Sequence, residues 1–67
     1  MDDEQFQKIL EEIIAALQKE GLSPLGQISG YLRTGNPAYI TTTNHAREKI
    51  LHLDKARLRE YLSQATQ

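Results

Sequence analysis

Two glycines and two prolines punctuate the middle of the chain: Gly21, Pro24, Gly35 and Pro37. Glycine adopts the left-handed backbone that ends many helices, and proline starts a helix readily but cannot lie in its interior without cost. Helices on either side of these breaks must therefore be short. We predict an all-α fold, a small bundle of about four short helices with one short extended segment at about residues 38–43.

The first helix is predicted from the spacing of apolar residues before Gly21. These residues recur at intervals of three and four, which places them along one stripe of a helix. Asp2, Asp3 and Glu4 complement the positive N-terminal end of the helix dipole, and Gly21 follows as a left-handed cap. The stripe consists of Phe6, Ile9, Leu10, Ile13, Ile14 and Leu17.

A second helix is predicted from Ser23 and Pro24, an N-cap hydroxyl followed by proline at the first helical position. This helix would run to about Thr34 and end at a Gly35 cap. Gly30 falls in its interior at a cost of roughly 1 kcal/mol relative to alanine, which is tolerated more readily where another backbone packs closely over it. The apolar face is predicted to hold Leu25, Ile28 and Leu32, with Tyr31 at its edge.

Residues 38–43, with the sequence AYITTT, favour an extended backbone because tyrosine, isoleucine and threonine are β-formers. A lone segment of this kind is either an irregular linker or a strand that pairs with its own copy in a second subunit. Thr43 or Asn44 is predicted to N-cap a third helix, and Asp54 a fourth. The inward positions expected in the third helix are Ala46, Ile50 and Leu53, and those in the fourth are Leu58, Tyr61, Leu62 and Ala65.

The chain has 67 residues and no cysteine, so it has little room for a core and no disulfide to support one. Small scaffolds of this kind gain stability by assembly, and we expect a homodimer.

No apolar run is long enough to span a membrane and the N-terminus is acidic, which predicts a cytoplasmic protein without a membrane partner. Residues 1–34 carry a charge of -3 and residues 35–67 a charge of +2, so the two halves could meet within the fold or across a dimer.

No residue pattern indicates a catalytic, metal or cofactor site. His45 and His52 would lie about 10 Å apart along a helix, which is too far for one metal ion. The carboxylates stand beside lysine and arginine, as on ordinary solvated helices, and no serine or threonine has a neighbouring histidine base. We therefore predict that the protein is not an enzyme and uses no cofactor.

A helix-turn-helix module that binds nucleic acid is the alternative function. The first two predicted helices and the glycine between them imitate that motif, in which Gln27, Ser29 and Arg33 would read bases. Only Arg33 is basic in that helix, whereas neutralising phosphates requires several lysines or arginines. The net charge of -1 also opposes it, so nucleic acid is not the expected partner.

The punctuated block resembles the IreB family of small bacterial proteins, which includes YrzL. The residues that carry the resemblance are EG at 20–21, SPLGQISGY at 23–31, TGNPAYI at 34–40 and NHAR at 44–47. The match runs without gaps from about residue 17 to residue 50 and extends more loosely to the last helix. It implies that residues 1–67 form a single IreB-like helical domain.

Family members are small helical homodimers and substrates of a transmembrane Ser/Thr protein kinase with cell-wall-sensing domains. They act as negative regulators of the response to cell-wall stress and of intrinsic cephalosporin resistance, with no catalytic activity or cofactor. The resemblance therefore implies a regulatory protein that works by protein contact. Tyrosine suits interfaces because its ring can be buried while its hydroxyl bonds. The residues predicted to form the interface are Gln27, Tyr31, Asn36, Pro37, Tyr39, Ile40 and Arg47.

The chain departs from the family pattern at its N-terminus. Family members carry their phosphorylated threonines in a flexible N-terminal extension, but this sequence opens with Met1-Asp2-Asp3 and has no serine or threonine before Ser23. That role has no matching residue here. The remaining candidates for phosphorylation are Thr41, Thr42 and Thr43, each of which would also suit an extended segment or a helix cap.

Overall fold

The computed structural model describes residues 2–65 and confirms the all-α fold. The four helices are α1 (Asp3–Lys19), α2 (Pro24–Thr34), α3 (Ala46–Leu51) and α4 (Lys55–Ala65). Two short 3-10 helices, η1 (Pro37–Tyr39) and η2 (Thr43–His45), lie between α2 and α3, and residues 2–65 contain no strand. The domain predicted over residues 1–67 also takes in residues 1, 66 and 67, which lie outside the described part.

Helix α1 is followed by the predicted left-handed Gly21, and its N-terminus is capped by Asp2, one of the acidic residues expected to complement the helix dipole. The Asp2 carboxylate accepts a hydrogen bond of 2.7 Å from the Gln5 backbone N–H, which satisfies one of the donors left free at a helix start. At the other end Gly21 has φ +74°, and the Leu22 N–H donates back to the Leu17 carbonyl oxygen at 3.0 Å. This arrangement ends the helix and turns the chain toward α2.

The predicted caps of α2 are also present. The Ser23 hydroxyl accepts from the Gly26 N–H at 3.3 Å, and Pro24 occupies the first helical position. Gly35 takes the left-handed conformation at the C-terminal end with φ +73°. The buried face differs from the expected one, because Ile28, Gly30 and Tyr31 are its buried residues whereas Leu25 and Leu32 are only partly covered.

The extended segment predicted at residues 38–43 is shortened by 3-10 turns at both ends, and Ile40 keeps extended backbone with φ -106° and ψ 129°. On its N-terminal side, proline fixes φ and the Asn36 side chain accepts a hydrogen bond of 2.9 Å from the Ala38 N–H, so a 3-10 turn forms over Pro37–Tyr39. On the other side the η2 turn begins at Thr43. Local turn chemistry thus overrides β-propensity, and the segment is an irregular linker.

The predicted N-cap of α3 is wrong. His45, at φ 59°, occupies the cap position without a side-chain hydrogen bond, and Asn44 before it is also left-handed at φ 53°. Asp54 does cap α4, since its carboxylate accepts from the Ala56 N–H at 2.7 Å. The three residues expected to face inward around α3, which are Ala46, Ile50 and Leu53, are buried.

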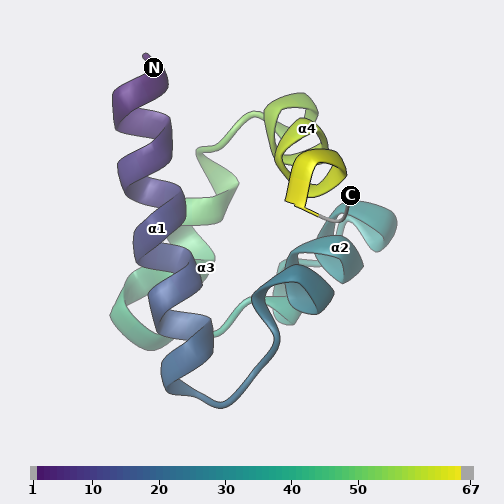
Figure 1. The fold of residues 1–67 in the computed structure, drawn as a ribbon. Coiled ribbons are helices and arrows are strands. Elements are labelled where there is room, and N and C mark those ends of the chain that lie inside the picture. The colour runs from purple at the N-terminus through teal and green to yellow at the C-terminus, as the bar shows by residue number, and fades with distance from the viewer. Residues whose placement is uncertain (1, 66–67) are drawn as a thin grey trace.

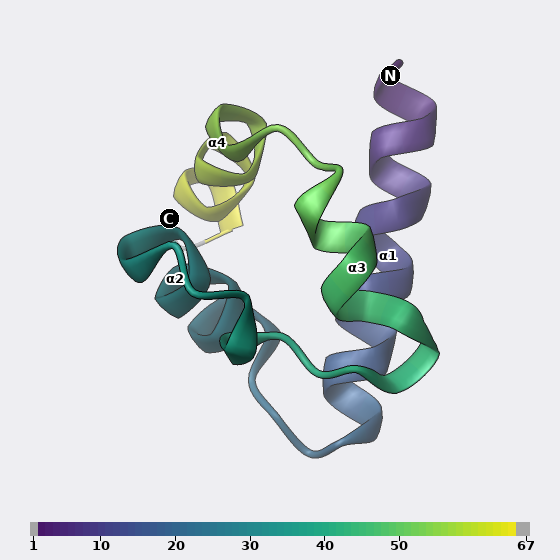
Figure 2. The same cartoon turned by 180° about the vertical axis from the view of Figure 1, so that it is seen from behind.

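The helices pack as two pairs around one core. Helix α1 lies against α3, and α2 lies against α4 (Figure 1). Seen from behind, the segment between α2 and α3 crosses from one pair to the other (Figure 2). The core between the pairs contains Phe6, Leu10, Ile13, Ala16, Leu17, Ile28, Tyr31, Ile40, Ala46, Ile50, Leu53 and Leu58.

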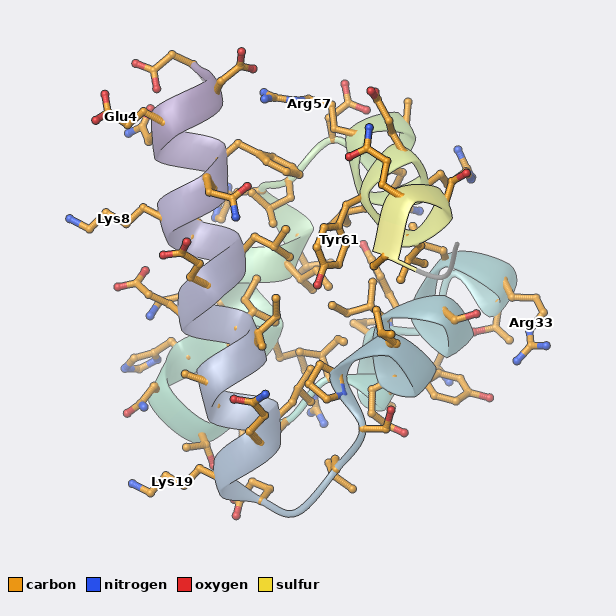
Figure 3. The ribbon with its side chains drawn as sticks, viewed as in Figure 1. Glu4, Lys8, Lys19, Arg33, Arg57 and Tyr61 are labelled. Atoms are coloured by element: carbon orange, nitrogen blue, oxygen red, sulfur yellow. The ribbon has the colours of Figure 1, made fainter. Side chains whose placement is uncertain are left out.

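Opposite charges of the two halves of the chain meet within the fold. The guanidinium of Arg57 forms an ion pair with Asp3 and lies over the Phe6 ring, 4.2 Å from its centroid. Figure 3 shows Arg57 reaching from α4 toward the start of α1, while Tyr61 points into the space between these helices. Lys49 on α3 lies 3.7 Å from Glu12 on α1. Both pairs join the acidic N-terminal half to the basic C-terminal half.

None of the helices within residues 2–65 combines the length and apolar character that crossing a membrane requires.

Candidate protein interaction surface

Gln27 and Tyr39 hold η1 against α2. The Gln27 side-chain amide donates a hydrogen bond of 2.8 Å to the Tyr39 carbonyl oxygen, across 12 residues of sequence. This bond satisfies a backbone acceptor that the short 3-10 helix leaves free. Four residues line a shallow depression at this junction, which we call the α2–η1 surface: Gln27, Asn36, Ala38 and Tyr39.

The Tyr39 ring packs directly on Gly30. A Cβ atom placed at residue 30 would stand 2.5 Å from both Cδ1 and Cε1 of the ring, closer than real Cβ contacts come. Gly30 is therefore required by an aromatic ring, rather than by the backbone contact expected from sequence. The ring remains partly accessible, and Tyr39 is 38% exposed.

The turn between α2 and η1 is held by side chains of the same block. The Thr34 hydroxyl donates to the Gly30 carbonyl oxygen at 2.8 Å and accepts from the Asn36 N–H at 3.2 Å. Asn36 in turn caps η1 through the bond to Ala38. These contacts fix the path of the chain through residues 34–38 and so place Asn36 and Tyr39 on one surface.

Arg47 anchors the other end of this segment to α3. Its Nε–H donates a hydrogen bond of 2.9 Å to the carbonyl oxygen of Ile40, whose side chain is fully buried. Because Ile40 directly follows Tyr39, this bond fixes the α2–η1 surface from the α3 side. The last residue of the Asn-His-Ala-Arg motif at residues 44–47 therefore bonds to Ile40, in the segment that precedes the motif.

The structure divides the seven predicted interface residues into three groups. Tyr31 and Ile40 lie in the core of the single chain, with 2% and 0% of their surface exposed, and the Lys55 ammonium lies 5.5 Å from the centroid of the Tyr31 ring. Arg47 is partly covered. The four remaining residues lie at or near the α2–η1 surface and are Gln27, Asn36, Pro37 and Tyr39. Their contact with a partner stays a prediction.

Leu51 is an exposed apolar residue that sequence reasoning did not select. It is 57% exposed, more than Leu22 at 39% and Tyr39 at 38%. Its position immediately after Ile50 was the available signal, because a short helix that buries Ala46 and Ile50 directs the next residue away from the core. It is an exposed apolar residue on α3, separate from the four residues that line the α2–η1 surface.

The three candidate threonines differ in their surroundings. The Thr41 and Thr43 hydroxyls lie 3.2 Å apart, and the Thr43 hydroxyl donates a hydrogen bond of 2.6 Å to the Glu20 carboxylate. Thr42 is exposed, and its side chain makes no capping hydrogen bond to η2. The structure therefore separates one freely presented hydroxyl from two that hold the linker to the end of α1.

Histidines and carboxylates do not assemble into a metal site within residues 2–65. His45 lies 3.6 Å from Glu48, and both side chains are largely exposed. For the nucleic-acid alternative, Arg33 in the last turn is the basic residue of α2 itself, and Lys55 of α4 lies over the Tyr31 ring of α2. Binding a phosphate backbone usually takes several such cations on one surface.

Comparison with protein families gives one match over nearly the whole chain. The model described as "IreB regulatory phosphoprotein" matches residues 1–65.

Proposed function

This chain belongs to the IreB family of regulatory phosphoproteins, and on that basis we propose that it is a non-enzymatic regulator that acts by contact with other proteins. It is modified by a Ser/Thr protein kinase in the cytoplasm and restrains the response to cell-wall stress and cephalosporin resistance. The match over residues 1–65 carries this proposal, since it spans the whole of the described fold.

The α2–η1 surface supports a contact function. The Asn36 N–H donates to the Thr34 hydroxyl, the Tyr39 ring packs on Gly30, and Arg47 donates to the Ile40 carbonyl oxygen next to Tyr39. Contacts within the chain therefore order this surface before a partner binds. Preorganised surfaces bind with a smaller entropic cost. Tyr39 supplies an aromatic ring of the kind enriched at interfaces, and Gln27 and Asn36 supply polar groups beside it.

A homodimer is part of the proposal. A chain of this length buries a small core, and Tyr39 and Leu51 remain exposed on the surface of the single subunit. Burying either side chain in an interface would remove apolar area from water, which favours association. We place Tyr39 in the dimer contact because its ring lies on the α2–η1 surface and remains 38% exposed.

A genetic experiment tests the regulatory role directly. Deletion of the gene in its native bacterium should increase survival on a cephalosporin, and expression of the unaltered chain should restore sensitivity. The matched control is expression of the chain with Gly30→Trp, which cannot coexist with the Tyr39 ring and so removes the ordered surface. Equal survival of the deletion and parent strains would contradict negative regulation.

Incubation of the purified chain with the catalytic domain of the Ser/Thr kinase and Mg²⁺–ATP tests the kinase relationship. The expected product has the mass of the chain plus one phosphoryl group. A mass that stays unchanged with active kinase would contradict the role as a kinase substrate.

A further inference from the structure

Most of the serine and threonine hydroxyls within residues 2–65 serve the fold. Ser23 caps α2, Thr34 bonds to Gly30 and Asn36, and Thr41 and Thr43 bond to one another. Ser29 lies inside α2 and Ser63 inside α4, so the backbone on both sides of each hydroxyl is helical. A kinase needs a hydroxyl that can enter its active site with the neighbouring backbone unwound, which such positions do not offer.

Thr42 is the exception. It is exposed, lies in the linker between Ile40 and η2, and leaves the N-terminus of η2 without a side-chain cap. The backbone that follows is irregular, since Asn44 and His45 are both left-handed. Left-handed geometry is unfavourable for most residues other than glycine, so straightening this backbone relieves strain that partly offsets the loss of the Thr43 bond to Glu20.

The surroundings of Thr42 suit a phosphate. Thr42, His45, Arg47 and Glu48 line one shallow depression. The Arg47 bond to Ile40 uses Nε–H, which leaves the two terminal nitrogens of the guanidinium for another acceptor. The negative charge of Glu48 would repel a phosphate on Thr42. The Arg47 guanidinium would attract it, because a guanidinium can bind two phosphate oxygens through parallel hydrogen bonds.

We propose that Thr42 is the residue that the kinase phosphorylates and that Arg47 binds the resulting phosphate. The inference rests on the proposed function of the chain as a kinase substrate. The Thr42 hydroxyl oxygen forms a bond to the γ-phosphorus of Mg²⁺–ATP, the bond from that phosphorus to the β–γ bridging oxygen breaks, and ADP leaves. The hydroxyl proton passes to the base of the kinase.

The position of Arg47 links this modification to the candidate interaction surface. Arg47 holds the carbonyl of Ile40, and Ile40 directly follows Tyr39 on the α2–η1 surface. A phosphate on Thr42 adds a second ligand to the same guanidinium. Phosphorylation therefore acts on the anchor of the surface that we propose for partner contact.

Phosphosite mapping of the full chain after reaction with the kinase domain and Mg²⁺–ATP tests the acceptor. Phosphate should appear on Thr42, and Thr42→Val should lower the initial rate by about tenfold or more while Thr42→Ser keeps it. Thr41→Val and Thr43→Val are the matched controls and should retain the modification. Phosphate on a different residue would overturn the Thr42 assignment and leave the kinase role intact, whereas an unmodified chain would overturn both.

A chemically synthesised chain with phosphothreonine at residue 42 tests the role of Arg47 without a kinase. In a ³¹P NMR titration, the second pKa of the phosphate should be about half a unit lower than in the same chain carrying Arg47→Gln, because the cation stabilises the dianion. His45→Gln in the same phosphorylated chain is the control, because it shows how much of the change in the phosphate pKa comes from the neighbouring imidazole. Equal phosphate pKa values with and without Arg47 would overturn the proposed phosphate contact.

Discussion

The Tyr39 ring occupies the space that a side chain at Gly30 would need. The distance from an ideal Cβ at residue 30 to the ring carbons Cδ1 and Cε1 is 2.5 Å, and that to Cγ is 3.1 Å. Since three ring atoms are involved, the ring has to move as a unit to make room. The glycine in the middle of α2 and the tyrosine in η1 are therefore parts of one contact.

Gly30→Ala should destabilise the fold by about 1–2 kcal/mol, because the overpacking cost exceeds the gain in helix propensity. The free energy of unfolding is measured by urea titration with circular dichroism detection. Gly26→Ala is the control in the same helix, where the nearest atoms are Ser23 Oγ and Cβ at 3.5 and 3.6 Å. It should stabilise by up to about 1 kcal/mol. In a Tyr39→Ala background Gly30→Ala should also become stabilising, and a cost that persists there would contradict the ring contact.

Gln27→Met should destabilise the chain by about 0.5–1.5 kcal/mol, because methionine has a similar length but cannot donate to the Tyr39 carbonyl oxygen. Gln18→Met, on the exposed surface of α1, is the control and should change the free energy of unfolding by less than about 0.5 kcal/mol. Denaturant titration gives the change in the free energy of unfolding for each variant. An equal change in Gln27→Met and Gln18→Met would show that the bond between Gln27 and Tyr39 adds nothing to stability.

The helices could be predicted because their signals are local. Asp2, Ser23 and Asp54 are short polar residues placed where a helix needs an acceptor, and Gly21 and Gly35 supply the left-handed ends. The segment at residues 38–43 takes the predicted form of an irregular linker, but it is extended over fewer residues than expected because β-propensity is a weak preference. Proline and an asparagine cap impose a 3-10 turn immediately before it.

The candidate site was predictable as a block of residues but not as a set of contacts. Gln27 and Tyr39 meet only because the chain reverses after Gly35, and no periodic pattern encodes that meeting. Tyr31 was expected at the edge of α2 and lies in the core instead, since α4 and η1 both pack on α2. Alanine at Tyr31 would thus remove a core ring at a cost of roughly 3–5 kcal/mol and could not test an interface.

His45→Gly should stabilise the protein by roughly 0.5–1 kcal/mol, because glycine adopts a φ of 59° without the penalty that a side chain incurs. The lost contact with Glu48 is exposed and contributes little. Thr42→Gly is the neighbouring control. Thr42 has an ordinary φ of -84°, so glycine there only increases the entropy of the unfolded chain and should destabilise. Thermal unfolding followed by circular dichroism would show whether each variant is more or less stable than the unaltered chain. A destabilising His45→Gly would argue against strain at that residue.

Arg47→Lys should destabilise the fold by about 1–2 kcal/mol although the charge is kept. Lysine lacks the Nε–H that donates to the Ile40 carbonyl oxygen at 2.9 Å, and its ammonium sits at the end of a flexible chain. Arg59→Lys on the exposed surface of α4 is the control and should be nearly neutral. Hydrogen exchange gives a local readout, since the amides of residues 38–42 should exchange faster in Arg47→Lys than in Arg59→Lys. Unchanged exchange in this segment would contradict the anchoring role of Arg47.

The proposed dimer is tested by light scattering coupled to size-exclusion chromatography. The mass should be about twice the 7.6 kDa of one chain. Tyr39→Ala should weaken association by at least about 1 kcal/mol, which is about a fivefold rise in the dimer dissociation constant, because an aromatic anchor is lost from the α2–η1 surface. Leu22→Ala is the matched control, since Leu22 is 39% exposed, close to the 38% of Tyr39, but lies in the connection between α1 and α2. A monomeric mass at high micromolar concentration would contradict the dimer, whereas equal weakening by both variants would remove Tyr39 from its contact.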